Sequence, residues 1–183
     1  ADANALEQDM NAYLTTTATE YYPDTDKMLF SVGFGGCGFK KVYHCPIRKR
    51  PVSESVDAKD LIVPSSATDL RNSIRVTHRI TDMPANTIRL MQLMGVYRDV
   101  ELNQPVQSTP NPVDAKTSGV IGVSANAMRP EDQNPTLYES LCELDIPGFE
   151  DVDDDGNPTG LKLPYRVTID KDSKQVLEIR RNW

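Results

Sequence analysis

The stretch LPYRVTIDKDSKQVLEIRR, residues 163–181, decides the fold of this chain. Apolar and polar residues alternate on both sides of Asp170–Lys174, which is polar throughout. Alternation with a period of two is typical of a strand that buries one face, and a polar interruption is typical of a turn. The stretch therefore predicts a β-hairpin that pairs Leu163–Ile169 with Gln175–Arg181, and with it an antiparallel sheet.

Patterns elsewhere in the chain predict further strands and helices. Alternating or apolar runs predict strands at residues 39–45, 52–56, 61–63, 74–81 and 136–146. Apolar residues at helical spacing predict a helix over 3–20 with one buried stripe, a helix capped by Asp24 or Thr25 after a break at 22–24, and a helix from Pro84 to about Gly95. We therefore expect an α+β fold, a mostly antiparallel sheet with hairpins, packed by two or three short helices.

Residues 100–135 lack periodicity and carry five prolines among Asn, Ser, Thr and Gln. An irregular connection of this length is unusual inside a compact domain, so we expect a linker that is disordered or packs against a sister subunit. Apart from this linker we find neither a domain boundary nor a repeat, and we interpret residues 1–183 as one domain. Because the chain begins without methionine, inside a predicted helix, we expect it to be a piece of a longer protein.

Charge and composition exclude several classes of protein. With 20 basic and 27 acidic residues the net charge is -7, whereas a protein that binds nucleic acid over its whole surface is normally basic. No stretch approaches the roughly 20 apolar residues of a membrane span, and residues 1–11 lack the pattern of a signal peptide, so we expect a soluble protein with no membrane partner. Three cysteines without framework spacing predict reduced thiols that serve as small core residues.

The run Gly33–Gly38 has the spacing G-x-G-x-x-G of a dinucleotide-binding loop. That mechanism needs a strand before the glycines and a helix after them, whereas a helix-like run precedes these and a strand-like run follows. We favour close helix packing or a tight helix-to-strand turn. A nucleotide-binding enzyme that uses this run is the alternative function.

Two groups of residues have side chains of the types that bind metal ions. Cys37, His44, Cys45 and His78 lack paired zinc-ligand spacing, and adjacent His44 and Cys45 on a strand point to opposite faces. Asp151–Gly156 copies the first half of an EF-hand loop, but Lys162 occupies the position of the bidentate glutamate. We expect no metal or cofactor, and a solvated acidic turn at residues 151–156.

The main basic cluster consists of Lys40–Lys41 and Arg48–Arg50, with Arg180–Arg181 added if the C-terminal hairpin lies nearby. Such a cluster contacts phosphate, acidic neighbours or a partner subunit, and we favour the subunit. No serine or cysteine lies in a recognisable nucleophile elbow, and no catalytic constellation is evident. We expect a protein that is not an enzyme.

Several stretches resemble the portal proteins of tailed bacteriophages, in particular the large portals of short-tailed phages. The resemblance touches most of residues 20–183. It rests on Gly35–Tyr43, Pro46, Arg50–Glu54, Asp60–Pro64, Ala67–Leu70, Arg75–His78, Gly160–Asp172 and Ile179–Trp183.

The resemblance implies a wing-region domain of a portal, a structural protein of the virion that is made in the bacterial host cytoplasm. Portal subunits form a dodecameric ring at one capsid vertex, the conduit for genome packaging and ejection and the head-to-tail junction. The implied partners are other portal subunits, terminase, capsid and scaffolding proteins, head-tail adaptor proteins, and genomic DNA passing through the channel of the full-length protein. No binding residue is implied, because no matched stretch is a defined site.

Overall fold

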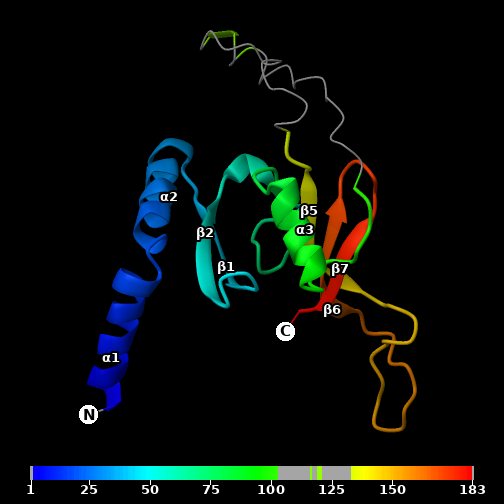
Figure 1. The fold of residues 1–183 in the computed structure, drawn as a ribbon. Coiled ribbons are helices and arrows are strands. Elements are labelled where there is room, and N and C mark those ends of the chain that lie inside the picture. Colours follow the sequence, from blue (N-terminus) through cyan, green and yellow to red (C-terminus); the bar gives the residue numbers. More distant parts are fainter. Residues whose placement is uncertain (1, 103–115, 117–118, 121–132, 183) are drawn as a thin grey trace. The chain divides into compact units, whose positions relative to one another are not determined.

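The computed structural model describes residues 2–102, 116, 119–120 and 133–182 (Figure 1). It confirms the α+β class, and the named elements of these residues are three α-helices and two antiparallel sheets of two and five strands. The chain divides into two compact units, residues 1–62 and 63–183, which are described one after the other. The single domain expected over residues 1–183 stays a prediction.

The first unit is built from two successive helices and a hairpin. In chain order its elements are α1 (Asp2–Ala12), the π-helical turn η1 (Tyr13–Thr17), α2 (Tyr21–Gly35), β1 (Phe39–Cys45), β2 (Arg50–Val56), the 3₁₀ turn η2 (Ala58–Asp60) and β3 (Leu61–Ile62). Strands β1 and β2 pair from Phe39 opposite Val56 to Cys45 opposite Arg50, which confirms the predicted hairpin.

Helix α2 begins at Tyr21, before the predicted break at residues 22–24. Pro23 lies in its first turn, where the missing N–H has no partner to lose and the fixed φ suits a helix. Asp24 does not cap the helix, since its own N–H donates to the carbonyl of Glu20 and its carboxylate accepts from Ser55 in β2. The predicted cap at Asp24 or Thr25 is therefore wrong.

The prediction that the first helix buries one apolar stripe is wrong. Helix α1 contains no buried residue, and Leu6 and Met10 are 65% and 52% exposed. Apolar spacing identifies a face suited to burial but not what covers that face.

The second unit contains β4 (Arg75–Ile80), α3 (Ala85–Leu93), β5 (Leu137–Leu144), β6 (Leu163–Asp170) and β7 (Val176–Arg181). Within this unit the strands pair in the order β4-β5-β6-β7, and each pair is antiparallel. The hairpin predicted from residues 163–181 is β6–β7, and the predicted helix after Pro84 is α3.

Helix α3 packs on this sheet and forms the main core. Ile88 and Met91 of the helix lie against buried side chains of three strands and the following loop: Ile80, Leu137, Leu177 and Tyr97. Most of the predicted linker at residues 100–135 lies outside the described residues. Its described start, Val100 and Leu102, packs against the core.

Candidate functional site

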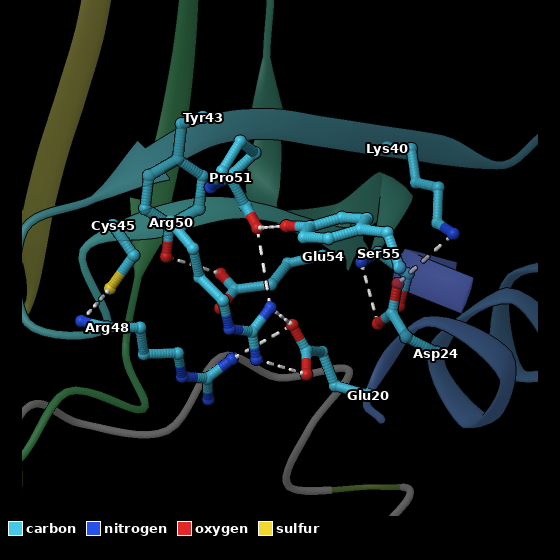
Figure 2. A network of polar contacts seen from close by, with 11 residues as sticks. Glu20, Asp24, Lys40, Tyr43, Cys45, Arg48, Arg50, Pro51, Glu54 and Ser55 are labelled. Carbon is cyan, nitrogen blue, oxygen red and sulfur yellow. Dashed lines mark hydrogen bonds and ion pairs between the residues drawn. The ribbon is translucent and has the colours of Figure 1, made fainter. Parts of the chain in front are cut away.

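The main polar network of the first unit joins the start of α2 to the β1–β2 hairpin. Figure 2 shows the guanidinium groups of Arg48 and Arg50 facing the Glu20 carboxylate. Arg50 donates to both oxygens of Glu20 at 2.6 and 2.7 Å, and Arg48 lies 3.4 Å away. The hydrogen bonds from Arg50 lower the pKa of Glu20 to about 2, and they raise the pKa of Arg50. Glu20 is thus a structural anion that fastens the hairpin.

Asp24 makes a second link between α2 and the hairpin. Its carboxylate accepts the backbone N–H of Ser55 at 2.8 Å and forms an ion pair with Lys40 at 3.7 Å (Figure 2). The Lys40 ammonium also lies 4.3 Å from the centroid of the Tyr21 ring, a cation–π distance. Helix α2 therefore meets its own hairpin largely through polar and charged side chains.

Large apolar side chains of α2 are also exposed on the side away from the hairpin. Tyr21, Asp24, Thr25, Met28 and Ser31 recur at three- and four-residue intervals and are half-buried. The exposed face carries four large apolar residues: Tyr22, Leu29, Phe30 and Phe34, at 59%, 58%, 69% and 84% exposure. Large apolar side chains thus lie on both the half-buried and the exposed side of α2. An exposed apolar cluster of this kind is typical of a protein contact.

A groove of about 310 Å³ adjoins this exposed face in the first unit. Its apolar lining comes from Phe30 and Phe34 of α2, Phe39 of β1 and Val56 of β2, and Lys59 also lines it. The rings of Phe30 and Phe34 contact each other at 4.9 Å between centroids. We call the exposed residues Tyr22, Leu29, Phe30 and Phe34 together with this groove the α2 surface.

The glycine run ends a helix and does not begin one. Gly33 and Gly35 belong to the last turns of α2, and Gly36, at φ 74°, donates its N–H to the carbonyl of Val32 as a C-terminal cap. Strand β1 follows at Phe39. The helix N-terminus that holds a pyrophosphate in dinucleotide-binding loops does not follow these glycines.

The cysteines and histidines considered for zinc are spread over both units. On β1, His44 is exposed and Cys45 is buried, as expected for neighbours on a strand, while His78 lies in β4 of the second unit. Cys37 is exposed, which corrects the expectation that all cysteines are core residues. Within the described residues, no group of three or more His, Cys, Asp or Glu side chains is placed to hold a metal ion.

Two carboxylates of the acidic loop, those of Asp151 and Asp153, accept hydrogen bonds from within the loop. One oxygen of Asp153 accepts the N–H groups of Asp155 and Asn157 at 3.1 and 2.8 Å, and Asp151 accepts the hydroxyl of Thr159 at 2.7 Å. These bonds form a closed turn of the kind that Asp favours.

The basic cluster is largely neutralised within its own unit. Glu20 pairs with Arg48 and Arg50, and Asp24 pairs with Lys40. These three basic residues therefore already have acidic partners, and the favoured contact with a partner subunit stays a prediction. Arg180, in the second unit, pairs with Glu178 at 3.0 Å.

Sequence reasoning missed the ion pairs of Glu20 and Asp24 with the hairpin and the exposed apolar residues of α2. One signal could have indicated the ion pairs: residues 1–26 contain six acidic and no basic residues, whereas residues 27–59 contain seven basic and two acidic residues. Such segregation favours pairing between the two segments.

Comparisons with known proteins assign this chain to no group. No protein-family model matches it, and a search of the curated proteins finds no significant match. None of the helices in the described part is both long and apolar enough to cross a membrane.

Proposed function

We propose that this chain is a structural subunit of a bacteriophage portal ring, part of the conduit for genome packaging and ejection at one capsid vertex. The observation that carries the proposal is the α2 surface. A helix that bonds to its own hairpin through Asp24 and exposes the large apolar side chains of Tyr22, Leu29, Phe30 and Phe34 is suited to a subunit that is covered by a neighbour.

The resemblance of the sequence to portal proteins supports the same proposal. The acidic net charge of -7 is compatible with it, because strong phosphate contacts would slow DNA that slides through a ring. The alternative, a nucleotide-binding enzyme, gains no support from a glycine run that closes α2.

The proposal is tested by the mass in solution of the complete gene product, measured by light scattering after size exclusion, with negative-stain imaging of the same sample. Residues 1–183 alone, measured in parallel, report whether this part associates by itself. We expect closed rings from the complete product. A product that stays monomeric over a range of salt concentrations would overturn the proposal and favour a binding module or an enzyme.

A further inference from the structure

We propose that α1 is a hinged arm that two polar contacts latch to the β1–β2 hairpin. The hinge consists of residues 14–19, between the two helices of the first unit. The latch consists of Arg50 and Pro51 of β2, which bind one residue on each side of the break between α1 and α2. The inference goes beyond the proposed function, and it holds whether or not copies of the chain close into a ring.

The chain between the two helices departs from α-helical geometry in two ways. It first forms the π-helical turn η1, in which the hydroxyl groups of Thr15 and Thr16 each donate to a carbonyl four residues earlier, at 2.6 and 2.5 Å. Hydroxyl bonds of this kind bend a helix, and π-helical turns are frequent at functional sites. Ala18, at φ −94° and ψ 62°, then lies outside the helical region altogether.

Pro23 prevents α1 and α2 from joining into one continuous helix. In such a helix its missing N–H would leave the carbonyl of Thr19 without a partner, and its ring would clash with that carbonyl. In the first turn of α2 the same proline loses no hydrogen bond. The break at Ala18 and Thr19 is therefore a property of the sequence, and α1 stays a separate arm.

The latch holds the chain on both sides of this break. Before the break, the Tyr13 hydroxyl donates to the carbonyl of Pro51 at 2.6 Å. After it, Arg50 donates to both carboxylate oxygens of Glu20 at 2.6 and 2.7 Å (Figure 2). Because Arg50 and Pro51 are neighbours on β2, one place on the hairpin fixes the end of the arm and the start of α2. Ala18 is 5% exposed, so the hinge turns only when the latch opens.

The rest of the arm offers no resistance to a turn of the hinge. Helix α1 buries none of its residues, and within the described part of the chain its side chains form no hydrogen bond or ion pair. Leu6 and Met10 are already 65% and 52% exposed, so a movement of α1 uncovers no core. Displacement of Arg50 from Glu20 should therefore change where α1 points, whereas α2 stays on the hairpin through Asp24 and Ser55.

Distances between spin labels test the latch in the 183-residue chain. Nitroxide labels are attached through p-acetylphenylalanine at Ala3 of α1 and Lys27 of α2, two exposed positions, and double electron–electron resonance gives the distribution of distances. We expect a narrow distribution in the chain with an intact latch. Tyr13→Phe combined with Arg50→Gln should widen it about twofold or more, because the arm then samples orientations that the latch excludes.

Two controls separate the release of the arm from unfolding of the unit. A second pair of labels, at Lys27 and at Val42 of β1, which is 72% exposed, should keep its distribution in the same variant. Tyr43→Phe removes a tyrosine hydroxyl that donates to Glu54 within the hairpin, at 3.1 Å, and should leave both distributions unchanged.

Tyr13→Phe combined with Glu20→Gln opens the latch from its other side and should reproduce the widening between α1 and α2. The proposal is overturned if neither latch variant widens that distribution, or if Tyr43→Phe widens it equally. Widening between Lys27 and Val42 as well would also overturn it, because Arg50 would then hold the whole unit together and not the arm.

Discussion

Leu137 shows what one buried side chain contributes to the second unit. Its exposed fraction is 0%, and it packs among Ile80, Ile88 and Leu177 in the core. We expect Leu137→Ala to lower the free energy of unfolding by about 2–5 kcal/mol, because it removes buried apolar surface and leaves a cavity. Urea unfolding of the two proteins measures the difference.

Leu141 is the matched control for that prediction. It lies on the same strand, four residues further on, and is 40% exposed. We expect Leu141→Ala to cost less than about 1 kcal/mol. Equal losses at the two positions would contradict the placement of the core under α3.

Glu20 predicts a dependence of stability on pH. The pKa of its carboxyl is lowered from 4.5 to about 2, chiefly by the hydrogen bonds from Arg50. A carboxylate with a lowered pKa in the folded state contributes stability that is complete above its unfolded pKa and is lost as the pH falls through the folded pKa. The difference in stability between the wild type and Glu20→Gln should therefore be constant near neutral pH and shrink between pH 4.5 and about 2.

Urea titrations of both proteins over this pH range provide the measurement. Because Glu20 is partly exposed, the effect should also weaken with added salt. Glu7→Gln is the control, since Glu7 is exposed on α1. A constant difference down to pH 2 would show that the clamp between Glu20 and Arg50 does not hold the hairpin.

At the scale of elements, two glycines of the run Gly33–Gly38 should respond in opposite directions. A Cβ at Gly38 would lie 2.7 Å from Cγ2 of Val32 and 2.9 Å from Cγ of Met28, which is too close. We expect Gly38→Ala to destabilise the first unit by about 1–3 kcal/mol through this overpacking. A Cβ at Gly33 meets nothing within 4 Å, so Gly33→Ala should stabilise α2 by up to about 1 kcal/mol.

Thermal unfolding followed by far-ultraviolet circular dichroism compares the two variants. The pair separates close packing from a role in ligand binding, since only packing predicts opposite signs at the two positions. Destabilisation by Gly33→Ala as large as that by Gly38→Ala would show that α2 ends differently.

The sequence predicted the strands better than the helices, for a physical reason. Alternation identifies β6 and β7 because both the buried face and the turn belong to one local segment. The start of α2 was missed because Pro23 is a breaker inside a helix but is tolerated in its first turn. The face of α2 that meets the hairpin could not be predicted, since it depends on the bonds from Glu20 and Asp24 to residues about 30 positions away.

For the whole molecule, we expect no change in melting temperature with ATP, NAD, GTP or calcium. A ligand that binds only the folded state at a hundred times its dissociation constant adds about 2.7 kcal/mol of stability, a shift of several degrees in a thermal scan. The glycine run caps α2 and the carboxylates of Asp151 and Asp153 accept internal hydrogen bonds, so neither feature offers a prepared site. A shift with a nucleotide that Gly36→Ala abolishes would favour the enzyme, and a calcium shift reversed by chelation would favour a metal-stabilised module.

Amide hydrogen exchange tests how stability is distributed over the chain and how association changes it. Helix α1 has 11 residues and no buried side chain, and a helix of that length is marginal in water without tertiary packing. Strand β5 is paired on both sides, with β4 and β6, and contains the fully buried Leu137. In dilute solution the amides of α1 should therefore exchange close to the rate of an unfolded chain, and those of β5 should exchange far more slowly.

Concentration separates the two causes of protection in that experiment. If a second copy covers α1, the amides of α1 should become protected as the concentration of the chain rises, while the amides of β5 stay unchanged. Protection of α1 that is already complete in dilute solution would mean that the chain covers Leu6 and Met10 itself, and the exposed face of α1 would then have no role between copies.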